Sequence, residues 1–279
     1  MLRGISIALC AFVAALPAFT QVKSSSPLVL DDGIEIITID EIPGRMMDAG
    51  LFSGPLTNER RLEYMPDGKA PSAVNVFLVK IGSKTYLIDA GFGNAIKENV
   101  IDPSKIDAIF ITHEHGDHVS GLLKEDGTAV FAAPVFINKK EREYWSAGKT
   151  PNSGLQKKTA KAYGNRYKTF SYGDSPAPGI VAIYASGHTP GHTAFLIGTG
   201  KKKLLIAADF LHAAALQFPN PDECASFDMD KKASIETRKR LIQMSIDNNW
   251  LIGGMHLPAP GYGRAKSNGK GGFDFTLGE

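Results

Sequence analysis

The feature that most constrains this chain is a six-residue run, His113-Glu114-His115-Gly116-Asp117-His118, in which four side chains can bind a metal ion. It follows directly after residues 106 to 112, a short apolar and β-branched run that predicts a strand. Side chains alternate in an extended segment, so His113 and His115 point to the same side and can bind one ion. Four potential ligands in six residues make a metal site the preferred interpretation over a chance cluster of loop histidines.

The rest of the run predicts a second ion beside the first. Gly116 permits a turn, after which Asp117 and His118 can face that second ion. The chain has two cysteines, Cys10 and Cys224, so imidazole and carboxylate groups have to hold the metal. This donor set suits zinc, with manganese, cobalt and iron as alternatives.

A second motif, Gly187-His188-Thr189-Pro190-Gly191-His192, combines two histidines with residues that fix a loop. One of these histidines is enough to bind metal. We expect His188 to be the ligand and His192 to be an outer hydrogen-bonding residue.

Asp209 and His256 each follow a further predicted strand, at residues 204 to 208 and 250 to 253. A carboxylate at the end of a strand can cap a helix or can bridge two ions through its two oxygens. Taken alone, neither residue is a decisive metal ligand.

Strands and helices alternate along the chain without an obvious linker or repeat, which predicts one α/β domain over residues 21–279. Strands are expected at 74–79, 85–88, 106–112, 134–137, 180–185, 194–197, 204–207 and 250–253, and helices at 139–145 and 230–248. Residues 147 to 178 are polar and are expected to form a helix with loops over a binding face. The histidines of the motifs follow predicted strands, where α/β folds place their sites.

The N-terminus predicts a signal peptide over residues 1–20. A basic start, Met1-Leu2-Arg3, precedes an apolar run from Ile5 to Leu16 and small residues up to Thr20. The alternatives are a buried N-terminal helix and a lipoprotein signal, and Leu9 before Cys10 is unfavourable for the latter. We therefore expect a periplasmic or secreted protein.

The charge balance gives no indication of a nucleic-acid or membrane partner. Lys and Arg number 31 against 29 Asp and Glu, a formal charge of +2. The longest basic run, Lys201 to Lys203, is interpreted as the tip of a hairpin. The N-terminal apolar run is too short to serve comfortably as a membrane anchor.

Together these residues resemble the metallo-β-lactamase superfamily. The resemblance is carried, in the order typical of that family, by Asp89-Ala90-Gly91, residues 113–118, residues 187–192, Asp209 and His256. It implies an αββα sandwich of two mixed β-sheets flanked by helices, with a site for two metal ions at one edge. It assigns His113, His115 and His188 to the first ion, Asp117, His118 and His256 to the second, and Asp209 to both.

A narrower resemblance, to methyl parathion hydrolase and its lactonase-like relatives, rests on residues 140–145, 209–218 and 255–261. Those proteins are exported, bind two metals and tend to be dimers. Their aromatic pockets imply that Trp145 and Phe92 contact substrate, with core packing as the alternative for both. Asp89 is expected to brace the metal loop.

The expected activity is that of an exported hydrolase with two zinc ions, whose metal-bridging hydroxide cleaves lactones or esters. N-acyl-homoserine lactones, the substrates of quorum quenching, and aryl esters are the expected examples, because an aromatic, largely uncharged pocket favours small, neutral, apolar molecules. Asp117 is the expected catalytic residue, since a ligand that touches the nucleophile can orient it and help to protonate the leaving group.

His212 stands three residues after Asp209, where acyl-homoserine lactonases carry a tyrosine that contacts the substrate carbonyl. An imidazole there can stabilise a developing oxyanion. The alternative is a partly exposed helix histidine.

Three other functions stay open at this point. They are an organophosphate phosphotriesterase of the methyl parathion type, a β-lactamase and a non-catalytic zinc-binding protein. Asp209 counts against the β-lactamase, because the antibiotic-cleaving branches of the family usually lack a bridging carboxylate. Seven ligands for two ions leave coordination positions for water, which favours catalysis over storage.

Overall fold

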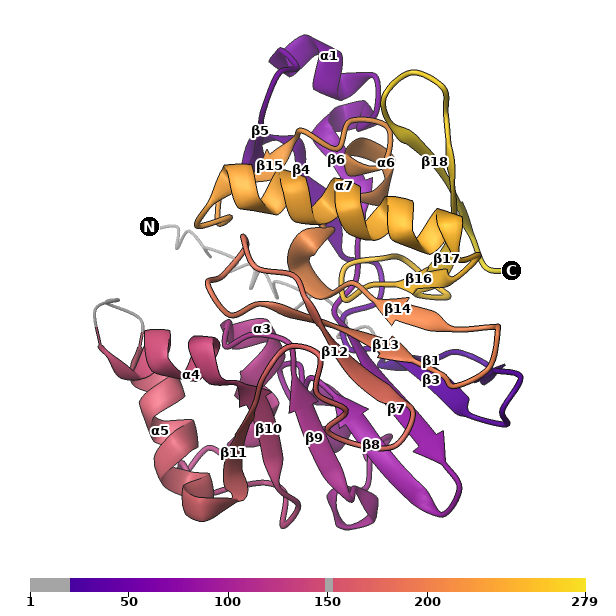
Figure 1. The fold of residues 1–279 in the computed structure, drawn as a ribbon. Coiled ribbons are helices and arrows are strands. Elements are labelled where there is room, and N and C mark those ends of the chain that lie inside the picture. The colour runs from indigo at the N-terminus through magenta and orange to yellow at the C-terminus, as the bar shows by residue number, and fades with distance from the viewer. Residues whose placement is uncertain (1–20, 149–152) are drawn as a thin grey trace, which may run out of the picture.

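The computed structural model describes residues 21–148 and 153–279, and over these the chain forms two mixed β-sheets packed face to face (Figure 1). The predicted signal peptide at residues 1–20 lies outside the described residues. No helix among the described residues is both long and apolar enough to cross a membrane.

The first sheet has eight strands, and it is parallel where it carries the first metal-binding motif. In spatial order its strands are β1 (Lys23–Ser24), β3 (Glu35–Asp40), β7 (Asn75–Ile81), β8 (Lys84–Ile88), β9 (Ala108–Ile111), β10 (Val135–Asn138) and β11 (Tyr167–Phe170), with β2 (Leu28–Val29) also beside β3. Strands β8 to β11 run parallel to one another, whereas β1, β2, β3 and β7 pair antiparallel. All four residues of β9 are buried, as expected for a central strand covered on both faces.

The second sheet has six strands with one parallel pair. In spatial order these are β12 (Ile180–Tyr184), β13 (Thr193–Ile197), β14 (Leu204–Ile206), β16 (Leu251–Gly253), β17 (Tyr262–Ser267) and β18 (Phe273–Leu277). Strands β14 and β16 are parallel, so Asp209 and His256, which follow them, emerge at the same edge of the sheet.

The main core lies between the two sheets. Phe110 of β9 and Phe195 of β13 meet there with ring centroids 6.0 Å apart, and both rings are fully buried. Burial of large apolar side chains from both inner faces is the chief favourable contribution to such a sandwich.

Helices cover the outer faces of both sheets, so the expected αββα arrangement is confirmed. The α-helices are α1 (Asn58–Leu62), α2 (Asn94–Lys97), α3 (Gly116–Val119), α4 (Lys139–Ser146), α5 (Gly154–Tyr163), α6 (Ala214–Gln217) and α7 (Lys231–Asp247). The short 3₁₀ turns are η1 (Ala49–Leu51), η2 (Pro66–Gly68), η3 (Pro103–Lys105), η4 (Ser120–Leu122), η5 (Gly164–Arg166) and η6 (Ala208–Phe210). Helix α7 crosses the second sheet (Figure 1), and its Leu241 and Ile242 pack against Leu205 and Ile252.

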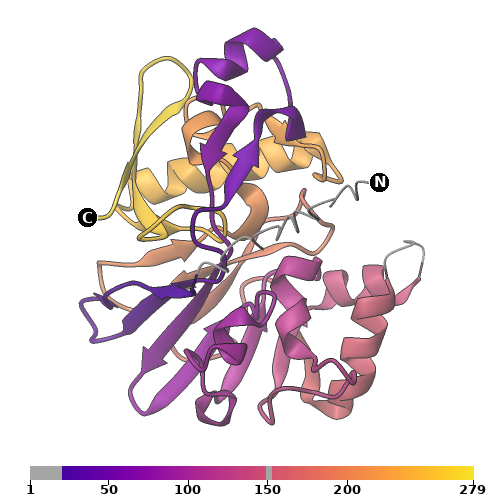
Figure 2. The same cartoon turned by 180° about the vertical axis from the view of Figure 1, so that it is seen from behind.

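Residues 46–71 form a cap above the sandwich, visible at the top of Figure 2. Its strand β4 (Met46–Asp48) pairs with β6 (Lys69–Pro71), and β5 (Phe52–Ser53) pairs with β15 (Cys224–Ala225) from the second half of the chain. Met47, Phe52 and Leu216 share one apolar cluster, which fixes the cap on helix α6.

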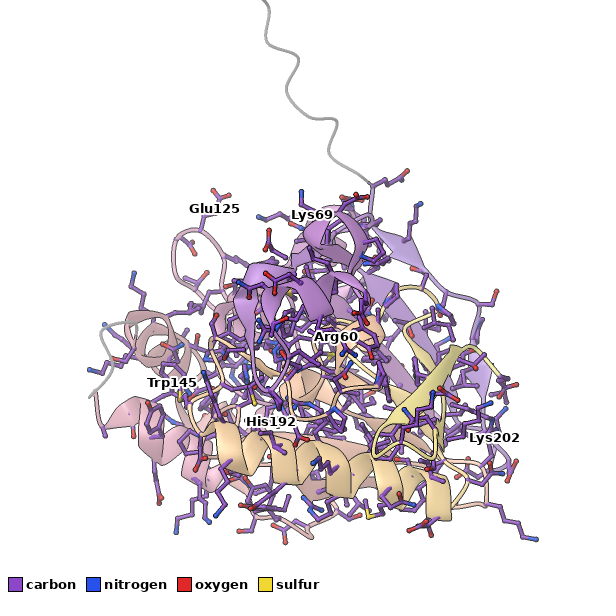
Figure 3. The ribbon with its side chains drawn as sticks, turned by 90° about the horizontal axis from the view of Figure 1, so that it is seen from above. Arg60, Lys69, Glu125, Trp145, His192 and Lys202 are labelled. Carbon is purple, nitrogen blue, oxygen red and sulfur yellow. The ribbon has the colours of Figure 1, made fainter. Side chains whose placement is uncertain are left out.

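The polar stretch from 147 to 178 contains helix α5, as expected, and also the edge strand β11, which the sequence pattern did not predict. Lys201 to Lys203 lie in the turn between β13 and β14. Lys202 and Trp145 lie at opposite sides of the molecule in Figure 3, so this basic run is remote from the pocket described below.

Candidate metal centre

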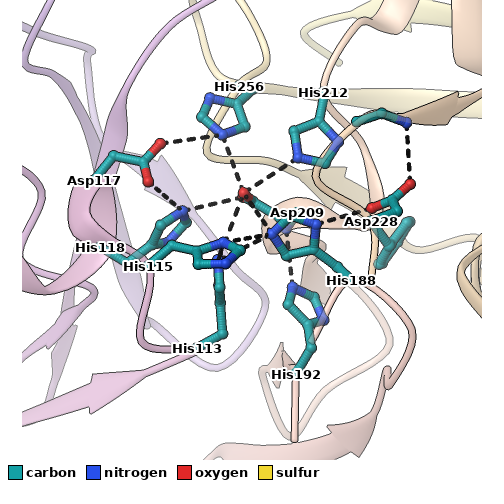
Figure 4. Close-up of polar contacts among 12 residues, drawn as sticks. His113, His115, Asp117, His118, His188, His192, Asp209, His212, Asp228 and His256 are labelled. Atoms are coloured by element: carbon teal, nitrogen blue, oxygen red, sulfur yellow. Dashed lines mark hydrogen bonds and ion pairs between the residues drawn. The ribbon is translucent and has the colours of Figure 1, made fainter. Parts of the chain in front are cut away.

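The seven expected ligands converge where the strand ends of the two sheets meet (Figure 4). They form two groups whose donor atoms all lie within 4.8 Å of one another. The first group is His113, His115, His188 and Asp209, and the second is Asp117, His118, Asp209 and His256. Asp209 belongs to both groups.

Three imidazole nitrogens of the first group face one another. His113 Nε2 lies 3.0 Å from His115 Nδ1 and 3.2 Å from His188 Nε2, and the last two nitrogens are 2.9 Å apart. Ligands about 2.05 Å from a tetrahedral zinc ion would be roughly 3.3 Å apart, close to this triangle. Burial holds the pKa of His113 well below its usual value, so its ring is neutral and able to coordinate. The residues therefore fit a divalent cation.

The second group combines two imidazoles with two carboxylates. His118 Nε2 lies 3.2 Å from Asp209 Oδ1, and His256 Nε2 lies 3.3 Å from Asp209 Oδ2. Asp117 is 3.7 Å from the Nε2 atom of each of these histidines. His118 Nε2 and Asp209 Oδ1 are buried and make no hydrogen bond with satisfactory geometry, which is unusual unless an ion takes them as ligands.

Asp209 is the central carboxylate of the cluster. Burial alone would raise its pKa, but the surrounding imidazoles, His118 and His256 foremost, hold it well below the usual value. Its backbone N–H donates to His192 Nε2 over 3.0 Å, while His192 Nδ1 donates to the Ala185 carbonyl over 2.9 Å. His192 thus orients Asp209 from behind and leaves no ring nitrogen for a metal.

Asp89 supports the second group from the end of strand β8. It accepts hydrogen bonds from the backbone and hydroxyl of Thr112 and lies 2.6 Å from His118 Nδ1. This contact points His118 Nε2 towards the cluster. Asp89 has a φ of 59°, a left-handed conformation that Asp and Asn tolerate better than most residues.

A matching support for the first group, Asp228, was not predicted from the sequence. Its Oδ1 lies 2.9 Å from His188 Nδ1, and its Oδ2 accepts from the backbone N–H of Ala225. The fully buried Arg238 on helix α7 lies 3.6 Å from the same carboxylate. A lone Asp in a loop carries no sequence signature of this role, so only the fold reveals it.

A cavity of about 640 Å³ opens beside the cluster. Its lining residues are Arg45, His115, Gly116, Asp117, Trp145, Leu155, Gln156, Asp209, Phe227 and Met229. Trp145 is there, as expected, whereas Arg45, Phe227 and Met229 were not predicted. The pocket was expected to be largely uncharged; Arg45, which directly precedes the cap, adds a cation to its wall beside the expected ligand Asp117.

The metallo-beta-lactamase superfamily model matches residues 70–248, a range that holds six of these seven ligands. The chain belongs to the metallo-beta-lactamase superfamily. With its two ligand groups it is a metal-dependent hydrolase of that superfamily.

Two solved structures share the fold. The hydrolase AbOPH of the beta lactamase superfamily is 28% identical, with a TM-score of 0.80 over 93% of this chain and 99% of that one. AidC, a dizinc quorum-quenching lactonase, is 24% identical, with a TM-score of 0.78 over 94% of this chain and 98% of that one.

Among curated proteins, a ribonuclease Z from Ligilactobacillus salivarius is 49% identical over 53 residues. The match covers 18% of this chain and only 17% of the length of that relative.

Phe92 does not line the metal pocket of this superfamily member, contrary to expectation. Gly91 before it has a φ of 59°, and the Phe92 backbone N–H donates to buried Glu41. This turn leaves the Phe92 ring 39% exposed, in the wall of a separate cavity with Ile96 and Leu123.

His212 is neither exposed nor helical, so that alternative is wrong. It lies fully buried between η6 and α6, with Nε2 3.2 Å from Asp209 Oδ2 and its ring stacked on His256. Burial lowers its pKa to about 4, so the ring is neutral and can donate to Asp209. Contact of His212 with substrate stays a prediction.

Proposed function

We propose that this protein is a hydrolase with two zinc ions that cleaves small lactones or carboxylic esters. The observation that carries the proposal is the pair of ligand groups sharing Asp209 beside a cavity with aromatic walls. N-acyl-homoserine lactones and aryl esters are the first substrates to test.

The first ion would be held by His113, His115 and His188, the second by Asp117, His118 and His256, and Asp209 would contact both. Two cations there would make a bound water acidic at neutral pH and would polarise a substrate carbonyl.

Asp117 is the proposed proton carrier. Its side chain is 22% exposed and lines the cavity, whereas Asp209 is almost fully buried, so Asp117 is the carboxylate that a substrate can approach. Burial would raise its pKa, but the neighbouring His118 lowers it overall, so the group is ionised. An ionised Asp117 can accept the proton of an attacking water and return it to the leaving oxygen.

The cavity wall supports a small and largely apolar substrate. Trp145 has its indole N–H bonded to Glu141 and presents the rest of the ring, while Phe227 packs edge-on against His188 and His212. Met229 extends this apolar surface. Arg45 adds a cation at the rim, suited to an oxygen-rich group of an otherwise neutral molecule.

A phosphotriester such as methyl parathion is the second candidate, because two aromatic walls, Trp145 and Phe227, also suit an aryl leaving group. We also propose that the chain is related most nearly to methyl parathion hydrolase and its lactonase-like relatives, and this second candidate is consistent with that relationship. We further propose, from the sequence, that the protein is exported to the periplasm or beyond as one domain over residues 21–279, and that it forms a homodimer.

The test is a comparison of four substrates with one preparation. The chain without residues 1–20 is purified, stripped with a chelator and reloaded with zinc. Turnover is then measured on an acyl-homoserine lactone, an aryl ester, methyl parathion and a cephalosporin, with the stripped protein as control.

We expect the highest kcat/KM on the lactone or the aryl ester and none with the stripped protein. Dominant turnover of methyl parathion would favour the second candidate, and dominant turnover of the cephalosporin would overturn the proposal. Fewer than two ions in fully active protein would contradict the two-ion site.

A further inference from the structure

A buried glutamate, Glu141, lies next to the proposed metal site but is not one of the proposed ligands. It is in the first turn of helix α4, and its side chain has no exposed surface. None of the ion pairs among the described residues involves it. A buried carboxylate is expensive to desolvate, so its retention requires several good hydrogen bonds.

Glu141 accepts four hydrogen bonds, two at each oxygen. Oε1 accepts from the backbone N–H of Glu114 over 3.1 Å and from the indole Nε1 of Trp145 over 2.7 Å. Oε2 accepts from the hydroxyl of Thr189 over 2.8 Å and from the backbone N–H of Gly191 over 2.9 Å. All four donors are fixed in direction by this one group.

The four donors belong to three separate parts of the site. Glu114 lies between His113 and His115 in the loop after β9, and Thr189 directly follows His188 in the loop of the second sheet. Trp145 forms a wall of the cavity. One carboxylate therefore joins the ligand loops of both sheets to the substrate pocket.

The close approach of helix α4 to the His188 loop depends on glycine. A Cβ at Gly191 would lie 2.1 Å from the backbone nitrogen of Glu141, which no ordinary contact permits. At the other end of this loop, a Cβ at Gly187 would lie 2.4 Å from the backbone nitrogen of Ser234 on helix α7. The loop is thus held between two helices, and Glu141 sets its position against α4.

We propose that Glu141 is a positioning residue for the first metal ion, holding the His113 and His115 loop at the distance from His188 that one cation requires. The inference rests on the two-ion site of the proposed function. Glu141 acts through residues next to His113, His115 and His188 in the chain. None of its four hydrogen bonds comes from a residue adjacent to Asp117, His118 or His256.

The decisive variant is Glu141→Gln, which keeps the shape of the side chain. Its amide NH₂ would face either the N–H groups of Glu114 and Trp145 or that of Gly191, so at least one donor loses its acceptor. We expect the affinity of the first ion to fall about 10- to 100-fold, as for removal of other outer hydrogen-bonding partners of metal ligands. The second ion should bind within about threefold of its normal affinity.

The measurement is a stepwise chelator titration of the cobalt-loaded protein, followed by its visible spectrum and by metal analysis. His188→Ala identifies the step that belongs to the first ion, and His256→Ala identifies the step of the second. Glu143→Gln is the matched control, because Glu143 is on the same helix but its side chain is 63% exposed. It should leave both steps unchanged.

Two further variants test the hydrogen bonds of Glu141 one at a time. They also keep the proposal testable if Glu141→Gln does not fold. Thr189→Val removes one of the two hydrogen bonds between Glu141 and the His188 loop, and it should weaken the first step. Trp145→Phe removes the indole N–H bond to Glu141 and part of the pocket wall, while a ring remains beside His115, so it should raise KM with the first step unchanged. Equal weakening of both steps, or no weakening in Glu141→Gln and Thr189→Val, would overturn the proposal. A wild-type protein that binds fewer than two ions would contradict the proposed function instead.

Discussion

The two ligand groups share Asp209 but are supported by different parts of the fold. The first group relies on the second half of the chain for His188, whose Nδ1 contacts Asp228 in the loop before helix α7. In the second group, Asp89 at the end of β8 contacts His118, and the backbone carbonyl of Ala73 contacts His256.

Each group thus has one histidine backed by a buried carboxylate, and these carboxylates come from different halves of the chain, Asp89 from the end of β8 and Asp228 from the loop before α7. Each group has one half-buried member, His115 in the first and Asp117 in the second, and only Asp117 is a carboxylate suited to carry a proton. We infer that the affinities of the two proposed ions can be lowered separately through these supports and together through Asp209.

The largest effect is expected from Asp209→Asn, which removes the charge shared by both groups. Both metal-binding steps should weaken, and kcat/KM should fall by more than about 100-fold, beyond the usual effect of losing an outer partner. Metal analysis after dialysis, with the matched surface variant Asp247→Asn, checks this. Loss of a single ion would show that Asp209 is a ligand of one group only.

Asp89→Asn should selectively weaken the second ion, by about 10- to 100-fold. Asn tolerates the left-handed backbone of Asp89 and can still accept from Thr112, so the fold should be retained. The readout is the chelator step identified by His256→Ala. If the first ion weakens equally, the supports are not independent.

Asp228→Asn should selectively weaken the first ion, by about tenfold. The substitution also removes the negative charge beside the buried Arg238, which then has only backbone carbonyl groups as partners. We therefore expect a loss of about 2 kcal/mol in unfolding free energy. Chemical denaturation of the metal-free protein measures the second effect separately from the first. An unchanged first step with reduced stability would make Asp228 a purely structural partner.

His212→Ala should have the smallest effect, because His212 contacts Asp209 and stacks on His256 but is outside both ligand groups. We expect both ions to be retained and lactone turnover to fall about tenfold, the value of one hydrogen bond of roughly 1.4 kcal/mol. Steady-state kinetics with metal analysis checks this. Loss of an ion would make His212 part of the metal site.

The convergence of the seven candidate ligands was predictable from sequence, because most of them follow clear strand patterns. The buried strand β9 delivers His113 to the edge of the sheet, and strands β14 and β16 do the same for Asp209 and His256. These strands are short, apolar and central, which is the clearest strand signal a sequence offers.

The rest of the site depends on tertiary contacts that leave no local pattern. Asp228 and Glu141 look like ordinary acidic residues, and Arg45 reaches the cavity from just before a cap built of strands of two or three residues. Strand β11 escaped prediction because Lys168 and Thr169 are exposed at the edge of the sheet, where polar residues are favourable. The prediction that Phe92 lines the metal pocket was wrong because a hydrophobic pattern does not show the turn at Gly91.

Gly187 and Gly191 limit the substitutions that the His188 loop can accept. Neither position has room for a side chain, since helices α4 and α7 press on the loop from both ends. By contrast, Phe227 and Met229 are 38% and 43% exposed and are free to vary in size. Directed evolution towards a new substrate should therefore accumulate substitutions at Phe227, at Met229 and in the cap beside Arg45, while the His188 loop and its support Asp228 stay unaltered.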